Sequence, residues 1–162
     1  MATENHADRS RTAREMVALA GLAAMWAIAG WARGSVLPQR IPVHFGIDGR
    51  PDAWGTASQI FLMPAIALGL YLVLSVAVRF PQSFHYGVAV TEENRARLQA
   101  TAIRMMGWMK AVVMWVMAVL VVFQVESART GSSGGIGVAA TVAPLAIFGV
   151  VVWLLVALRR AA

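Results

Sequence analysis

The chain of 162 residues contains no cysteine, so its fold uses neither a disulfide nor a thiolate metal site. Charge is also scarce, because Asp, Glu, Lys and Arg together make up only 14% of the sequence. Soluble domains carry roughly 25% charged residues. Apolar residues, in contrast, make up 59% of the chain. The composition therefore indicates a membrane protein.

Four long apolar stretches follow one another along the chain. A helix that crosses a hydrocarbon core of about 30 Å needs about 20 predominantly apolar residues. Stretches of this kind predict spans at about 16–33, 58–79, 104–125 and 136–158. Lys110 lies near the start of the third, where we expect its ammonium to snorkel to the headgroups. The sequence thus predicts an all-α membrane fold, with residues 1–162 forming a single transmembrane domain of four helices.

Basic residues are distributed unevenly between the two sides of these spans. Ten of the 14 lie in the N-terminal tail, around the connection between spans two and three, and at the C-terminus, against four on the other side. The positive-inside rule then places both termini in the cytoplasm and the first loop outside. Arginines beside apolar spans favour the lipid bilayer, and not nucleic acid, as their partner. The arginine- and alanine-rich composition further suggests a multi-pass protein of a bacterial cytoplasmic (inner) membrane.

The connection between spans two and three predicts a helix that begins before the membrane. Thr91 is a typical N-cap, and acidic residues follow it in the first turn, where the helix dipole favours them. We expect one long helix from Glu92 to Val125. Its arginines would contact lipid phosphates or form a solvated basic face. The following segment, 126–135, is rich in Gly and Ser and predicts a flexible linker.

The loop between spans one and two, residues 37–55, is the most distinctive segment. Apolar residues alternate with Pro42 and His44 over Ile41–Phe45, as in a half-buried strand. The dipeptide Asp48-Gly49 is a turn signal. The loop therefore predicts a short extracytoplasmic β-hairpin between helices 1 and 2. Two features support this placement. Phe45 and Trp54 have aromatic rings that prefer the membrane interface. Thr56 and Gln59 form a capping box that opens the second span.

The same loop carries a motif. From Leu37 to Gly55 it reads Leu-Pro-x-x-Ile-Pro-x-His-Phe, three residues, then Gly-x-Pro-Asp-x-Trp-Gly. This resembles the bacterial membrane family called domain of unknown function 1648, which also forms the N-terminal part of SdpI-type immunity proteins. The resemblance implies an immunity- or sensor-like protein whose outer loop binds a peptide or a membrane-protein partner. The candidate binding residues are Pro42, His44, Phe45, Asp48, Gly49, Asp52 and Trp54.

The ionisable residues of the loop leave two other interpretations open. His44, Asp48 and Asp52 are an oxygen and nitrogen set that suits Zn²⁺, which would allow a metal-assisted enzyme at the outer face. A hydrogen-bonded pair of His44 and Asp52 that only fixes the loop needs the same geometry. A further interpretation is a small accessory subunit of a membrane complex whose partner carries the activity. No catalytic motif is present, so we predict no catalytic residue, no cofactor and no resident metal.

Overall fold

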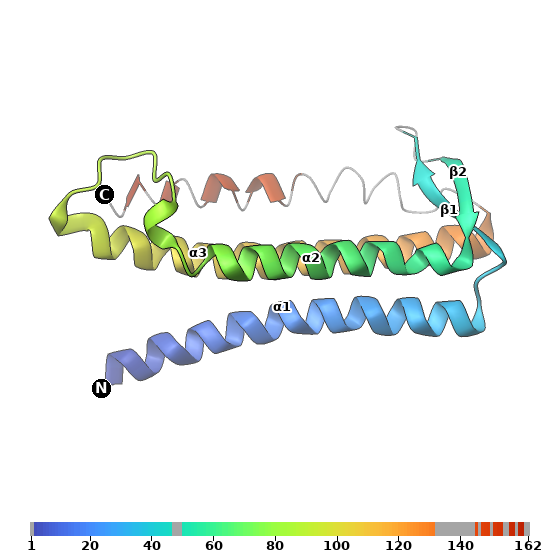
Figure 1. The fold of residues 1–162 in the computed structure, drawn as a ribbon, viewed down its shortest axis with the longest axis horizontal. Helices are drawn as coiled ribbons and strands as arrows, with labels where there is room; N and C mark the ends of the chain where they lie inside the picture. Colours follow the sequence, from blue (N-terminus) through green and yellow to red (C-terminus); the bar gives the residue numbers. More distant parts are fainter. Residues whose placement is uncertain are drawn as a thin grey trace.

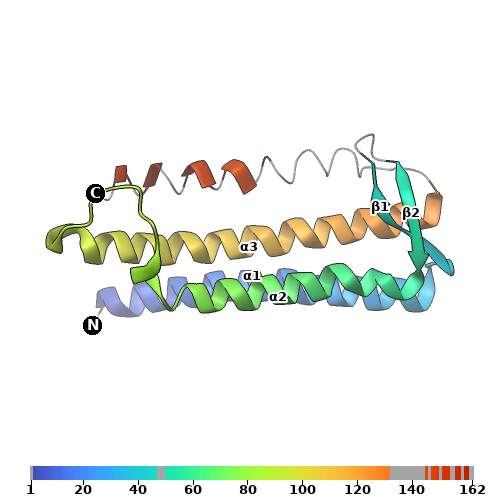
Figure 2. The same ribbon diagram turned by 45° about the horizontal axis from the view of Figure 1, so that its top comes forward.

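The computed structural model describes residues 2–46 and 50–131, and in the C-terminal region residues 145, 147–149, 151–153, 156–157 and 159–160. Three long helices run side by side, with a hairpin at one end and the start of the first helix at the other (Figures 1 and 2). The elements, in order, are α1 (Ala2–Ser35), β1 (Arg40–Phe45), β2 (Pro51–Thr56), the 3₁₀ turn η1 (Ala57–Phe61), α2 (Leu62–Ala77), the 3₁₀ turn η2 (Pro81–Ser83) and α3 (Glu92–Thr130).

The described helices have the length and composition of membrane spans. Three segments are long and apolar enough to cross a membrane: Asp8–Ser35, Ala57–Ala77 and Glu92–Thr130. They coincide with the first three predicted spans, and the predicted hairpin lies between the first two as a two-stranded antiparallel sheet. The fourth predicted span, 136–158, falls largely outside the described residues.

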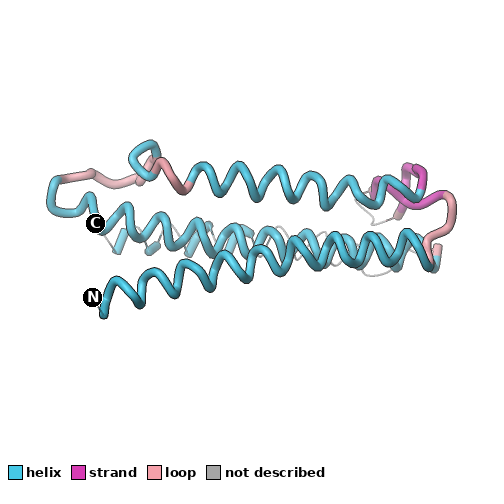
Figure 3. The backbone as a smooth tube through the Cα atoms, turned by 60° about the horizontal axis from the view of Figure 1, so that its bottom comes forward, coloured by secondary structure: helices cyan, strands magenta, loops and turns pink. Residues whose placement is uncertain are grey.

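The core lies between α1 and α3, which pack together from about Arg14 of α1 onward, while the beginning of α1 diverges from the bundle (Figure 3). Small residues allow this approach. A Cβ added at Gly21 would lie 3.2 Å from both Met114 and Trp115, and the Trp115 indole donates a hydrogen bond to the Val17 carbonyl (3.0 Å). One face of each helix is buried in this contact. Its apolar members are Ala18, Leu22, Met25, Ala29 and Ala32 on α1, and Ala111, Met114, Ala118, Val121 and Val125 on α3.

Large apolar side chains cover the outer surface of the bundle. Leu62, Leu72 and Val73 of α2 are more than half exposed. Because acyl chains are as apolar as these side chains, such a surface is stable in a bilayer, and close packing rather than the hydrophobic effect holds the helices together.

The segment before α3 packs against the beginning of that helix. Tyr86 is buried with Leu98 and Ala102, and its hydroxyl donates to the Pro81 carbonyl (2.6 Å). Burial raises the pKa of the Tyr86 hydroxyl, so this donor keeps its proton. Thr91 caps α3 as predicted, because its Oγ1 accepts from the Asn94 backbone N–H (3.3 Å).

The far end of α3 corrects one prediction. The helix continues to Thr130 and ends at Gly131, whose φ of +66° is typical of a helix C-terminus. Residues 126–130, predicted as part of a flexible linker, are therefore helical. Ser127 and Ala128 are buried, and Glu126 pairs with Arg129 one turn later (3.5 Å), which together support the extra turn.

Candidate functional site

The hairpin is fixed to the helices through its first strand. Ile41 is fully buried in the main apolar core. Gln124 of α3 donates from Nε2 to the Pro42 carbonyl (3.0 Å), and the Ala57 N–H donates to the Gln39 carbonyl (3.0 Å). Contacts to both α3 and η1 therefore fix β1 to the bundle.

The predicted pair of His44 and Asp52 forms. His44 Nδ1 and Asp52 Oδ1 are 2.6 Å apart, and the two side chains are 70% and 50% exposed. Antiparallel pairing is irregular at this point, since the register skips Val43 on β1 and Asp52 on β2. Such bulges commonly redirect a side chain. Here the irregular pairing brings the Asp52 carboxylate to the imidazole on an exposed surface.

The other signature residues differ in their surroundings. Trp54 is 48% exposed, Phe45 is half-buried and Pro42 is buried. Asp48 and Gly49 lie outside the described residues. In the part of the chain that the structure describes, no group of three His, Asp or Glu side chains is placed to hold a metal ion. His44 and Asp52 are thus two candidate ligands without a described third.

A pocket opens beside the hairpin. It has a volume of about 510 Å³ and lies between the end of α1, the segment that leads into β1 and the end of α3. Leu37 and Pro38, the first residues of the motif, line it. Arg129 of α3 lines it too. The motif therefore contributes both to the exposed hairpin and to an adjacent hollow that holds a basic side chain.

A second polar cluster lies inside the bundle, where the sequence predicted a snorkelling lysine. That prediction is wrong, because Lys110 is 1% exposed and points into the core. Its Nζ donates to both oxygens of Glu15 (2.5 and 2.8 Å) and to Ser75 Oγ (3.0 Å), and it lies 4.6 Å from the centre of the Tyr71 ring. The Tyr71 hydroxyl donates to Glu15 Oε2 (2.9 Å).

This charged cluster, Glu15, Tyr71, Ser75 and Lys110, joins all three helices. α1 supplies the carboxylate, α2 the hydroxyls and α3 the ammonium. An ion pair in apolar surroundings needs complete hydrogen bonding, and the ring and hydroxyls complete it here. A lone lysine in one span and a glutamate at the edge of another were the signals in the sequence. Their pairing depends on how α1 and α3 are aligned.

Comparison with known proteins bears on the hairpin. Residues 19–68 match the family described as Domain of unknown function (DUF1648). These residues form a DUF1648 domain. It spans the second half of α1, the hairpin, η1 and the first turns of α2, so it includes the whole motif 37–55. The charged cluster lies outside the DUF1648 match. No curated protein and no solved structure matches the chain.

Proposed function

We propose that this DUF1648 protein is a membrane-embedded binding protein whose hairpin recognises a peptide or a membrane-protein partner outside the cell. One observation carries the proposal: the hairpin is fixed to the bundle, yet it exposes the pair of His44 and Asp52 and, two residues after Asp52, the half-exposed Trp54. An ion pair so exposed contributes little to stability. A preorganised polar surface with an aromatic anchor is, however, well suited to recognition.

The pocket beside the hairpin supports the same proposal. Its lining residues Leu37 and Pro38 offer apolar contacts, and Arg129 offers a charge. A metal-assisted enzyme is less well supported, because catalytic zinc usually has three protein ligands and the described residues supply two. We therefore place recognition, not catalysis, at this end of the bundle.

The proposal requires a defined orientation. We propose that the chain crosses a bacterial inner membrane four times, with both termini in the cytoplasm and the hairpin outside. The excess of basic residues supports this, with nine against four once the buried Lys110 is left out of the ten. So does the position of the hairpin, which lies at the opposite end of the helices from the start of α1 (Figure 1).

The absence of cysteine provides a clean test of orientation. Gln39→Cys lies beside the hairpin and Gln82→Cys in η2 at the other end, and both side chains are exposed. We expect a membrane-impermeant maleimide to label Gln39→Cys in intact cells, and Gln82→Cys only after permeabilisation. The reverse pattern would invert the topology, and labelling of both in intact cells would contradict a spanning arrangement.

Recognition is tested by crosslinking from the hairpin. With a photoreactive phenylalanine at Trp54, we expect a discrete crosslinked product in cells of the native host. His44→Ala or Asp52→Ala should reduce its yield about tenfold or more, because a lost hydrogen bond to a charged group contributes about 1.5–3 kcal/mol. The same photoreactive residue at Gln82 is the control.

Membrane abundance separates recognition from folding. His44 and Asp52 are exposed, so both alanine variants should reach the membrane in wild-type amounts. Reduced abundance in both would show that the pair is structural. A crosslinked product that does not depend on His44 or Asp52 would leave these residues without a role in binding.

A further inference from the structure

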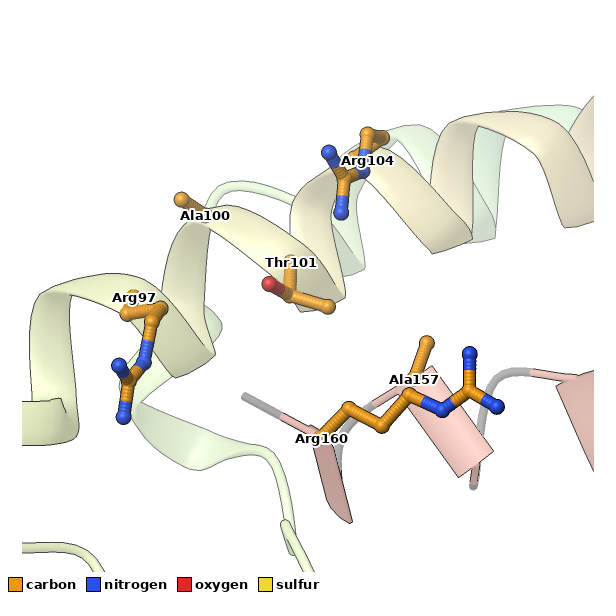
Figure 4. A pocket seen from close by; sticks show the side chains of 6 residues that line it. All are labelled: Arg97, Ala100, Thr101, Arg104, Ala157 and Arg160. Atoms are coloured by element: carbon orange, nitrogen blue, oxygen red, sulfur yellow. The ribbon is translucent and has the colours of Figure 1, made fainter. Parts of the chain in front are cut away.

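A second pocket lies at the end of the bundle opposite the hairpin. It has a volume of about 510 Å³ and lies between the beginning of α3 and the C-terminal residues Ala157 and Arg160. Figure 4 shows Arg97 and Arg104 on the α3 side, with Thr101 between them, and Arg160 on the other side. Because Arg97, Thr101 and Arg104 are spaced by four and three residues, they share one face of the helix. Two segments distant in the sequence thus contribute three arginines to one hollow.

The described lining of this pocket carries three arginines. None of the described residues that line it is acidic. Arg14 of α1 lies within electrostatic reach of both Arg104 and Arg11, which adds positive potential from a second helix. Like charges gathered in this way repel one another, so a bound anion would stabilise the arrangement. Guanidinium groups match phosphate oxygens in charge and geometry, and they bind them through paired N–H donors.

The depth of the pocket in the bilayer indicates which phosphate is available. The apolar part of α3, residues 105–125, is about 31 Å long at 1.5 Å per residue, which equals the thickness of a hydrocarbon core. Thr101 then lies about 6 Å outside the hydrocarbon, and Arg97 about 12 Å. The headgroup layer is roughly 5–8 Å thick on each side. Thr101 is therefore at the level of the lipid phosphates, with Arg104 at the inner edge of the headgroup layer, about 1.5 Å outside the hydrocarbon. Arg97 lies beyond that layer, and its long side chain has to reach back toward the phosphates.

We propose that this pocket is a binding site for the phosphate headgroup of an anionic phospholipid. Figure 4 shows the three guanidinium groups pointing in different directions, so binding requires them to turn toward the phosphate: Arg97 and Arg104 from α3, and Arg160 from the C-terminal segment. The headgroup then links two parts of the chain that would otherwise repel each other. Basic pockets at the cytoplasmic side of transmembrane helices have this property in general. The site is independent of the hairpin and of the proposed binding of a partner there.

The test uses the full-length protein in neutral detergent and native mass spectrometry. The probes are phosphatidylglycerol, phosphatidylcholine with the same acyl chains, and inorganic phosphate. We expect phosphatidylglycerol to bind at least tenfold more tightly than phosphatidylcholine. The triple variant Arg97→Gln, Arg104→Gln, Arg160→Gln should lose this preference. A matched triple variant removes the same charge from exposed positions at the same end that do not line the pocket, and should keep the preference within about twofold: Arg9→Gln, Arg79→Gln, Arg95→Gln.

A pair of neighbouring charge reversals guards against misfolding. Arg159 and Arg160 are both exposed, but only Arg160 lines the pocket. Arg160→Glu should weaken phosphatidylglycerol binding at least fivefold more than Arg159→Glu, although the net charge of the two variants is the same. Equal losses in these two variants, or in the two triple variants, would overturn the proposal in favour of diffuse attraction. Inorganic phosphate that binds as tightly as the lipid would overturn the assignment to a lipid.

Discussion

Glu15→Gln is expected to lower the free energy of unfolding by about 3–5 kcal/mol, the cost of leaving one partner of a buried ion pair alone. The charge left behind is that of Lys110, which is only 1% exposed and has no access to water. A lone ammonium among apolar helices is one of the most costly groups in a membrane protein. The effect should therefore be large even though glutamine keeps the shape of glutamate.

Removing the other partner of the ion pair should lower the free energy of unfolding by less. Lys110→Met removes the ammonium but leaves the Glu15 carboxylate, which is 35% exposed and keeps its hydrogen bond from Tyr71. We expect a loss of about 2–3 kcal/mol, below the usual cost for breaking a buried pair, because water still reaches the carboxylate. The double variant Glu15→Gln, Lys110→Met leaves no buried charge and should be within about 1 kcal/mol of the wild type.

These free energies are accessible by titration with sodium dodecyl sulfate in mixed micelles, followed by far-ultraviolet circular dichroism. Arg95→Gln is the matched control, since Arg95 and Glu92 form an exposed pair at 3.4 Å, and its loss should change stability by less than about 0.5 kcal/mol. A larger loss of unfolding free energy in Lys110→Met than in Glu15→Gln would contradict this argument, because it would show that the more buried of the two charges is not the more costly one to leave unpaired. If the double variant were as unstable as the worse single variant, the ion pair itself would make a net contribution to the stability of the bundle. The losses in the single variants would then not come from an unpaired charge alone.

The error over Lys110 shows where the sequence was insufficient. Hydropathy locates the spans, but it does not say which turn of one helix lies beside which turn of another. Glu15 and Lys110 are 95 residues apart, and Glu15 belongs to a segment that appeared to be a polar tail because charged residues precede it. In the structure α1 begins at Ala2, and this segment is already helical alongside α3. A charge near the end of a span can reach a headgroup or a partner, and only the helix alignment decides between them.

The hairpin, in contrast, could be predicted because its determinants are local. Alternation around His44, a turn after Ile47 and the capping residues Thr56 and Gln59 all act within a few positions of one another. The structure contains the strands, the pair of His44 and Asp52, and the hydrogen bond from the Thr56 N–H to Gln59 Oε1 (2.7 Å). The capping box opens the 3₁₀ turn η1 and not α2 itself. Local signals place a chain reversal well and the type of helical turn less well.

Gly55→Ala is expected to lower the free energy of unfolding by about 1–3 kcal/mol, because it overfills the junction between the hairpin and η1. A Cβ at Gly55 would lie 1.7 Å from Gln59 Oε1 and 2.8 Å from Val43 Cγ1. The Gln59 amide can swing away, but it then loses its hydrogen bond to Thr56. Val43 is β-branched and fixed within β1, so relief there requires β1 to move.

Two further variants separate these contributions. Gly30→Ala is the matched control: nothing lies within 4 Å of an added Cβ there, and alanine should stabilise α1 by up to about 1 kcal/mol. Gln59→Ala removes the closer contact, so adding Gly55→Ala to it measures the clash with Val43 alone. If Gly55→Ala does not lower stability in the Gln59→Ala background, Val43 moves aside at no cost, and the Gln59 amide is the only contact that excludes a side chain at position 55. A cost that persists shows that β1 resists displacement. A strand fixed in this way keeps the exposed pair of His44 and Asp52 in place for binding.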